Sequence, residues 1–315
     1  MADIDTRHLQ FTVDPGTATW SVRHKADGST FTQIHPDLTI DGETVNLAEC
    51  APALGSSQVT NALGSFRTFA MLYDRPGGLR ITYCLLVSEN TPDVLVKLGV
   101  SNRTGRELVV RKLTPIEAAG VSLPGDPAGW RVIGDGKTYR DPYVGHAVAE
   151  GGQPLHSWWY AAAKDPESGS SLLLGNLTNH KGLGRFTWTY DGDARALRMT
   201  AWCDYEGIVM PDGAEIAPET VLLNFGERGT DSLERFGELI AKAHDIDLAK
   251  LAPLDPDDPT VSAVFNLWNS FGAGVVRGVE YSHDKKHGQA FQDPEWREKN
   301  QRLFNELGLH KFIHP

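Results

Sequence analysis

The stretch Arg185-Phe186-Thr187-Trp188-Thr189-Tyr190 decides the fold class of this chain. Its three aromatic and three polar residues alternate strictly, so an extended strand places all the aromatic side chains on one face and all the polar ones on the other. Such a strand packs one face on a core and presents the other to water, as antiparallel sheets commonly do. The stretch therefore predicts an antiparallel sheet with one solvated face.

Other runs of the same kind lie on both sides of this stretch. Residues 79–83 alternate as well and continue as an apolar run through Val87, as a more buried strand would. Turn residues such as Asp27-Gly28 and Pro76-Gly77-Gly78 separate the runs. So many strands are too many for one small sheet, and we predict a mainly β fold with a large antiparallel β-sandwich over residues 1–229. The further strand-like runs are 94–100, 107–113, 171–175, 195–203 and 219–225.

A helix and a linker are predicted over residues 230–259. Asp231 and Glu234 have the spacing of a capping box. A Pro- and Asp-rich stretch, 253–259, ends this region. Apolar residues recur at helical spacing along one face, namely Leu233, Phe236, Leu239, Ile240 and Ala243.

Residues 260–315 follow a different pattern. An apolar strand candidate at 261–268 is followed by a long loop containing Gly and His, a helix opened by Asp293-Pro294, and a second strand at 309–313. Strand, helix and strand predict the first βαβ unit of a (β/α)8 barrel. Because this unit alone leaves apolar faces and strand edges uncovered, we expect it to be truncated from a longer barrel, unless the sandwich covers it.

Composition excludes several classes of partner. Lys plus Arg number 30 and Asp plus Glu 41, for a net charge of −11, and no basic stripe predicts a nucleic-acid surface. No apolar run approaches the roughly 20 residues that cross a bilayer, and the first residues do not resemble a signal peptide. The three cysteines are far apart and form no CxxC pair. We therefore predict a cytoplasmic protein with no membrane partner, no metal and no cofactor.

The order of segments resembles glycoside hydrolase family 36, the α-galactosidase and raffinose synthase group. Residues 98–105 look like a sandwich strand of that family that ends in an Asn-x-Thr/Ser-Gly turn. Residues 156–160, followed by 165–175, look like its hairpin before a Leu-Leu-x-Gly strand. Residues 218–220, with the helix after them, look like the approach to the barrel, and 264–270 look like its first strand.

This resemblance implies a retaining glycosidase that acts on α-galactosides or related oligosaccharides, with a sandwich that forms one wall of the sugar pocket and supports a homo-oligomer. Such enzymes use two carboxylates across the glycosidic bond. In the family these carboxylates follow later barrel strands, whereas this sequence ends at His314-Pro315. No catalytic residue is therefore assigned within this chain. A non-catalytic carbohydrate-binding or assembly module is the main alternative.

Three residues are predicted to bind substrate. Trp268 and Asn269 lie at the carboxyl end of the first predicted barrel strand, where barrel active sites are built, although Trp268 can equally belong to the core. His283 lies in the loop that follows and can contact substrate from there. His283 and His287 are four residues apart, so both could bind one metal ion if this segment were a helix. The intervening lysines and Gly288 favour a solvated loop instead.

Two further features of the predicted sandwich remain open. Trp158, Trp159 and Tyr160 form the densest aromatic cluster of the sequence. If they continue a strand, adjacent side chains face opposite ways and one tryptophan belongs to the core. The other then packs between the sandwich and the barrel, or stacks on a sugar. A mutarotase-like sugar epimerase is the second alternative function. It needs a histidine and a glutamate for acid–base chemistry, and the candidates are His156 or His180 with Glu150 or Glu167.

Overall fold

The computed structural model describes residues 2–135, 143–148, 154–192, 196–228 and 231–246, together with two short strands farther on. The chain divides into two compact units, Met1–Ile246 and Asp247–Pro315. In the second unit, β20 (Val275–Val276) and β21 (Val279–Glu280) form an antiparallel pair. The strand, helix and strand predicted at 261–268, from 293 and at 309–313 lie outside the described residues.

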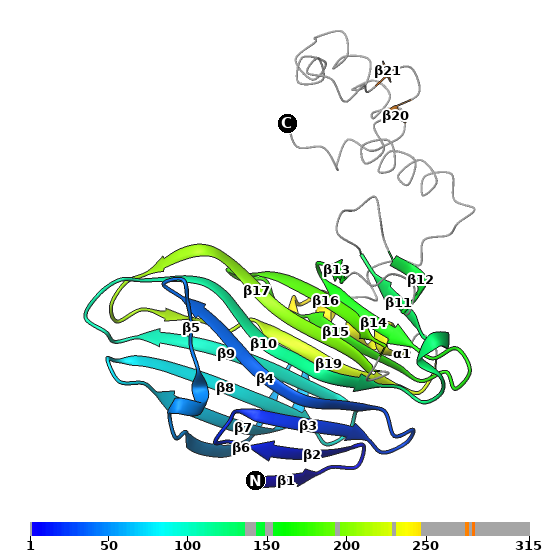
Figure 1. Cartoon of the computed structure of the whole chain (residues 1–315), viewed down its shortest axis with the longest axis horizontal. Helices are drawn as coiled ribbons and strands as arrows, with labels where there is room; N and C mark the ends of the chain where they lie inside the picture. Colours follow the sequence, from blue (N-terminus) through cyan, green and yellow to red (C-terminus); the bar gives the residue numbers. More distant parts are fainter. Residues whose placement is uncertain are drawn as a thin grey trace. The chain divides into compact units, whose positions relative to one another are not determined.

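The first unit is an antiparallel sandwich of two sheets, here sheet A and sheet B (Figure 1). Sheet A has nine strands in the order β1-β2-β3-β4-β10-β17-β16-β13, with β5 paired to β4. Its strands are β1 (Ala2–Asp5), β2 (Leu9–Asp14), β3 (Thr19–His24), β4 (Thr30–Ile40), β5 (Glu43–Thr44), β10 (Leu108–Ser122), β13 (Leu155–Ser157), β16 (Leu183–Asp191) and β17 (Ala196–Met210).

Sheet B has ten strands in the order β12-β11-β14-β15-β19-β9-β8-β7-β6, with β18 paired to β9. Its strands are β6 (Ala53–Asn61), β7 (Gly64–Asp74), β8 (Leu79–Ser88), β9 (Asp93–Asn102), β11 (Arg131–Gly134), β12 (Tyr143–Ala147), β14 (Tyr160–Lys164), β15 (Ser171–Asn176), β18 (Glu215–Ile216) and β19 (Thr220–Gly226). Two single-turn 3-10 helices, Leu47–Glu49 and Pro127–Gly129, lie in the connections.

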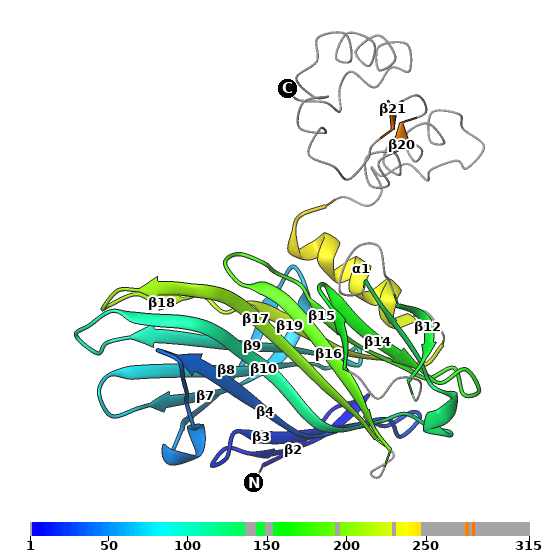
Figure 2. The same ribbon diagram turned by 45° about the horizontal axis from the view of Figure 1, so that its top comes forward.

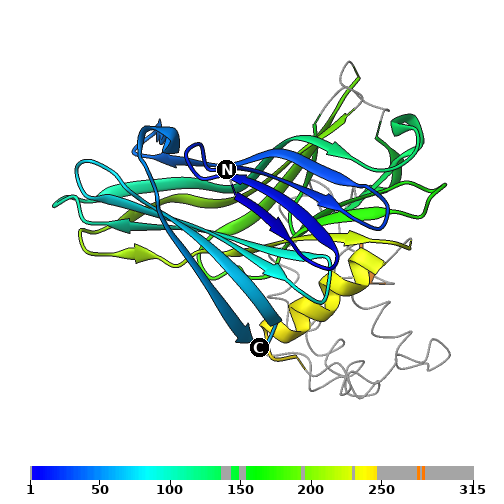
Figure 3. The ribbon, with the colours of Figure 1, turned by 90° about the horizontal axis from the view of Figure 1, so that it is seen from below.

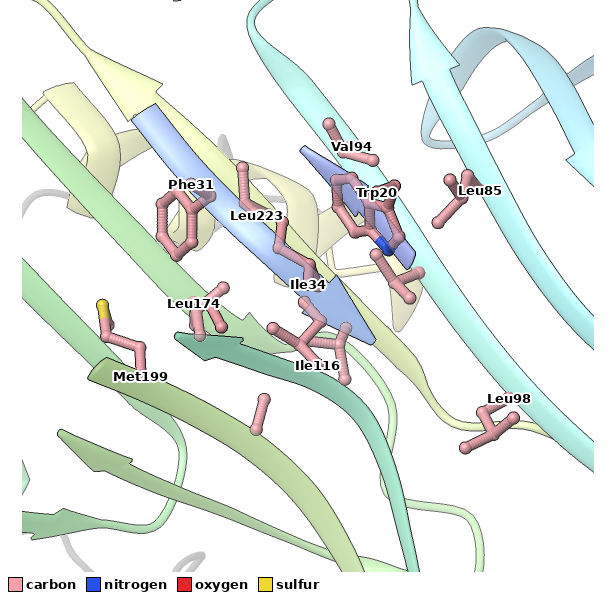
Figure 4. Packing of buried hydrophobic residues seen from close by; sticks show 14 of the residues in the cluster. Trp20, Phe31, Ile34, Leu85, Val94, Leu98, Ile116, Leu174, Met199 and Leu223 are labelled. Carbon is pink, nitrogen blue, oxygen red and sulfur yellow. The ribbon is translucent and has the colours of Figure 1, made fainter. Parts of the chain in front are cut away.

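The main core lies between the inner faces of the two sheets (Figure 4). Trp20 and Phe31 from sheet A pack there with Leu85 and Leu223 from sheet B, and all four side chains are at most 1% exposed. A buried hydrogen-bond chain also joins the sheets: the Trp20 indole donates to the Tyr83 hydroxyl at 2.7 Å, and that hydroxyl donates to the Pro115 carbonyl at 2.9 Å. The large sandwich predicted from the sequence is confirmed.

A second apolar cluster covers the outer face of sheet B. Helix α1 (Asp231–Ala243) lies on that face, in contact with β15 and β19 (Figure 2). Phe236 and Leu239 are buried there against Leu173 and Leu222, whose strand neighbours point into the main core instead. The helix predicted from apolar spacing is confirmed. The helix begins at Asp231 itself, so the Asp231 carboxylate lies in the first turn. There its negative charge interacts favourably with the positive end of the helix dipole.

The three cysteines are free thiols, with Cys203 buried and Cys50 and Cys84 half-buried. Burial raises the pKa of the Cys84 thiol, so it remains protonated and unreactive at neutral pH. Among the described residues, no helix has the length and apolarity that a membrane span requires.

Candidate functional site

The predicted substrate-binding residues Trp268, Asn269 and His283 lie outside the described residues, as do His287 and Glu150. The described part of the chain does bring one residue of a predicted cluster, Trp158, to a surface with other polar and aromatic groups. That surface is the outer face of sheet A, and we describe it from its edge inward.

Trp158 and Trp159 lie where the chain passes from one sheet to the other. Ser157 ends β13 in sheet A, and Tyr160 begins β14 in sheet B. The two tryptophans occupy the bend between the strands, and their side chains are 37% and 53% exposed. The expectation that one of them belongs to the core is wrong, because the segment bends here and does not continue as a strand.

The Asp135 carboxylate fixes this bend. It accepts hydrogen bonds from the backbone N–H of Trp158 at 2.8 Å and of Trp159 at 3.3 Å, and also from the Ser157 hydroxyl. On the other side, the Trp159 carbonyl accepts from the N–H of Asn176 at 2.9 Å. Burial and the nearby Asp135 carboxylate raise the pKa of Tyr160, so its hydroxyl remains protonated. The tryptophans are therefore exposed on a backbone that is held in place.

Aromatic rings and cations alternate from this edge across the outer face. The Arg185 guanidinium lies over the Trp158 ring, with its Cζ 3.3 Å from the ring centroid. Trp202, half-buried on β17, is the direct cross-strand neighbour of Arg185 on β16. The Lys112 ammonium from β10 lies 5.2 Å from the Trp202 centroid. Cation–π stacking of this kind holds ring faces in fixed positions while their remaining surface stays available.

A row of polar side chains crosses the same face beside these rings. Cross-strand register places His35 of β4 opposite Glu117 of β10, Glu117 opposite Thr200 of β17, and Thr200 opposite Thr187 of β16. Directly opposed residues share a face of the sheet, and the neighbours of Thr187 along its strand, Phe186 and Trp188, are buried in the core. His156 of β13 continues the row opposite Thr187. The row therefore spans five strands of the outer face.

A cavity of about 300 Å³ opens on this row. It is lined by His35, Glu117, Ala118, Ala119, Thr187, Thr189, Arg198 and Thr200. Arg198 is also paired with Asp191, at 3.1 Å. Hydroxyl, imidazole, carboxylate and guanidinium groups thus converge on one hollow beside exposed aromatic rings, an arrangement that suits a polar ligand with an apolar face.

Two larger cavities, of about 440 and 580 Å³, lie elsewhere on the first unit. In each, one lining arginine is already paired with a carboxylate: Arg235 with Asp93, and Arg106 with Asp41. Neither cavity is lined by a tryptophan or a histidine. Size alone does not select a site, and the outer face of sheet A has the more suitable chemistry.

Comparison with known proteins supports the fold and leaves the function open. No family model and no curated protein matches the sequence. An α-N-acetylgalactosaminidase from Bifidobacterium bifidum, solved with GalNAc, superposes with a TM-score of 0.54 at 10% identity, covering 98% of this chain and 50% of that one. A TPR-domain-containing protein from Parabacteroides distasonis gives a TM-score of 0.50 at 10% identity, covering 73% of this chain and 48% of that one.

The chain thus spans half or less of the length of these structures. At such low identity, the likeness shows the fold alone. The resemblance to family 36 is supported at this level, through the sandwich shared with a glycosidase.

Of the histidine and glutamate pairs predicted for an epimerase, those with Glu150 lie outside the described residues, and those with Glu167 do not meet in the described structure. Glu167 lies in the turn after β14, whereas His156 precedes that strand, and the five residues of β14 span about 16 Å. His180 is exposed in the loop after β15. A different histidine and glutamate, His35 and Glu117, lie directly opposite each other on neighbouring strands and line the same cavity. No pattern in the sequence indicates this pair, because it depends on the register of two strands that are distant along the chain.

Proposed function

We propose that this chain supplies the sandwich of a glycoside hydrolase that acts on α-galactosides or related oligosaccharides, and that the outer face of sheet A binds the saccharide. The observation that carries the proposal is the set of exposed tryptophans beside a polar cavity on a fold shared with an α-N-acetylgalactosaminidase. The resemblance of the sequence to family 36 points to the same class of substrate.

Aromatic and polar residues of this face have different roles in binding the saccharide. The Trp158 ring packs against the C–H face of a pyranose, which excludes water from both surfaces. Thr187, Thr200 and Glu117 exchange hydrogen bonds with hydroxyl groups, which orient the sugar. Hydrolysis needs two carboxylates placed across the glycosidic bond, and we assign no such pair among the described residues. The role of the sandwich in this proposal is recognition of the saccharide.

The test is to titrate the protein with methyl α-galactoside, N-acetylgalactosamine and an α-linked galacto-oligosaccharide, following tryptophan fluorescence and calorimetry. Trp158→Ala should weaken binding at least about tenfold, which corresponds to about 1.4 kcal/mol. Val209→Ala is the control, because Val209 is 51% exposed at the far end of β17. No binding by the unmodified protein would contradict the proposal.

Hydrolysis of p-nitrophenyl α-galactoside or its N-acetylgalactosaminide is measured on the same samples. Binding at the face together with hydrolysis supports a glycosidase. Binding without hydrolysis fits both the sandwich of a glycosidase and the non-catalytic carbohydrate-binding module.

A sugar epimerase remains the second candidate, and the facing pair His35 and Glu117 favours it. Ring opening at an anomeric centre needs one group to take the proton of the anomeric hydroxyl and another to protonate the ring oxygen. Optical rotation of pure α-galactose tests this candidate directly. Relaxation no faster than in buffer eliminates it, whereas acceleration that Glu117→Gln abolishes supports it.

A further inference from the structure

The two sheets end in four edge strands, and one edge differs from the other three. Exposed edges invite pairing with another chain, and proteins usually protect them by shortness or by charge. β13 has three residues, β1 has four, including Asp3 and Asp5, and β12 has five. β6 has nine residues and borders sheet B (Figure 3).

The β6 edge has none of the usual protection. Its sequence, Ala-Leu-Gly-Ser-Ser-Gln-Val-Thr-Asn, contains no charged residue and no proline. Eight of its nine residues are exposed, with Val59 the exception, and Leu54 has 65% of its side chain in solvent. Within the described part of the chain, β7 alone pairs with β6, over all nine positions.

The register of β6 on β7 determines which backbone groups are free. Asn61 and Gly64 pair across the two-residue turn Ala62-Leu63, so they form a hydrogen-bonded pair. Hydrogen-bonded pairs alternate with non-hydrogen-bonded ones along an antiparallel ladder. The odd-numbered residues of β6 therefore bond to β7. Leu54, Ser56, Gln58 and Thr60 direct their N–H and C=O groups to the free edge.

We propose that β6 pairs with β6 of a second copy of this chain, antiparallel and centred on Ser57, so that sheet B continues across a twofold axis. This register places Ser56 opposite Gln58 of the second copy, and Leu54 opposite its Thr60. All four free positions are then used on each strand, giving about eight hydrogen bonds between the copies. A twofold interface uses the same patch on both copies, as most homodimers do.

The side chains of β6 suit this self-pairing. No like charges meet, because the strand has no charge. Leu54 lies on the same face as Ser56 and Gln58, next to Met71 and Phe69 of β7, which pack on the main core. Pairing would extend this face and cover the exposed leucine with Thr60 of the second copy. A peptide from another protein would use the same backbone groups, and in that case the protein alone would be monomeric in the first test below.

The first test combines mass measurement with a charge swap. Light scattering after size exclusion should give twice the chain mass of 34.5 kDa at micromolar concentration. Ser56→Lys combined with Gln58→Lys places like charges opposite each other, and should raise the dissociation constant at least about tenfold. Ser56→Lys combined with Gln58→Glu places opposite charges in the same positions and should retain the dimer.

A matched control adds the same charge elsewhere. Gln10→Lys with Thr12→Lys modifies exposed positions of β2 in sheet A and should leave the mass unchanged. A monomeric unmodified protein would overturn the proposal. So would a dimer that survives the two lysines at 56 and 58, or one that both charge variants dissociate equally.

The second test measures the register. In the proposed pairing, Ser57 faces Ser57 of the second copy in a non-hydrogen-bonded pair, with Cα atoms about 4.5 Å apart, within the range that a disulfide spans. Ser57→Cys should therefore give a covalent dimer on mild oxidation. Thr60→Cys should not, since six residues of strand separate the two positions by about 20 Å. The unmodified protein, oxidised in the same way, is the control for cross-linking through the native cysteines. Equal cross-linking of both variants would overturn the register.

Discussion

Asp93, at the start of β9, is a buried carboxylate with several hydrogen-bond partners. Its side chain is fully buried and accepts hydrogen bonds from Arg235 at 2.7 and 2.9 Å, from Asn224 at 2.7 Å and from Thr91 at 2.6 Å. It joins a strand, its neighbour β19 and helix α1 at one point. Removing one partner of a buried ion pair is costly because the other charge remains without compensation.

We therefore expect Asp93→Ala to lower the free energy of unfolding by about 3 kcal/mol. Urea unfolding followed by far-UV circular dichroism measures the change. Asp74→Ala is the matched control, because its bidentate pair with Arg80 lies at the surface, where solvent screening leaves an ion pair little effect on stability. Equal effects of the two substitutions would contradict the structural role of Asp93.

Glu219 is the residue from which we predict a pH dependence. Burial alone would raise the pKa of Glu219, but hydrogen bonds from the N–H groups of Lys181 and Gly182 and from the Thr178 hydroxyl outweigh it, and its pKa lies below the ordinary 4.5. A carboxyl with a lowered pKa stabilises the fold above its unfolded pKa. That contribution is lost as the pH falls through the folded value.

Glu219→Gln should accordingly reduce stability at pH 7 by about 1.5–3 kcal/mol, the usual contribution of hydrogen bonds to a charged group. The difference from the unmodified protein should shrink as the pH falls below 4.5. Thermal unfolding between pH 3 and 7 measures both curves. Glu167→Gln, at an exposed position, should leave the curve unchanged. Parallel curves for Glu219→Gln and the unmodified protein would refute the prediction.

At the scale of the element, alternation predicted the strands that have one apolar face. β16 is the clearest example, with Phe186 and Trp188 buried as expected. β6 gave no such signal, because its small and polar residues resemble a loop and it forms only by pairing with β7. Helix α1 was predictable from its apolar spacing. The strand surface that it covers was not, since that depends on how the sheets pair.

Helix α1 docks on sheet B where β15 lacks a side chain. A Cβ atom added at Gly175 would lie 2.6 Å from Cδ2 of Phe236 and 3.0 Å from Cδ2 of Leu173. Gly175→Ala should therefore displace Phe236 and destabilise the protein by about 1–3 kcal/mol, as overpacking does. Hydrogen exchange of the α1 amides should accelerate, and that is the measurement.

The control for this prediction is another strand glycine with space around it. A Cβ atom at Gly55 of β6 would meet only the Cβ of Ala70, at an ordinary 3.8 Å. Gly55→Ala should leave exchange in α1 unchanged. If Gly175→Ala also leaves it unchanged, the contact between Phe236 and β15 does not hold the helix.

At the scale of the whole molecule, the sandwich was predictable and most of the candidate site was not. The tryptophan pair was evident as a cluster in the sequence. The row from His35 through Glu117, Thr200 and Thr187 draws one residue from each of four strands. Alternation tells which residues of a strand face outward, but not which strand lies beside it. Strand order and register therefore had to come from the structure.

The carboxyl boundary of the sandwich is also a question at this scale. The sequence predicts a sandwich over 1–229 and assigns the helix to the linker region, whereas the first compact unit runs from Met1 to Ile246. Phe236 and Leu239 are buried with Leu173 and Leu222 in the cluster on sheet B, so the helix contributes to the core of that unit. A chain that ends at 229 would expose this cluster to water.

We therefore expect residues 1–246 alone to unfold cooperatively, with a midpoint within a few degrees of the full chain. Residues 1–229 should lose several kcal/mol, because each large apolar side chain returned to water costs about 1.5–3 kcal/mol. Differential scanning calorimetry compares the three proteins, and binding of a dye for exposed apolar surface reports the uncovered cluster. Equal midpoints for the two shortened chains would show that α1 belongs to the linker. A lower midpoint for 1–229 alone would place the end of the folding unit after the helix.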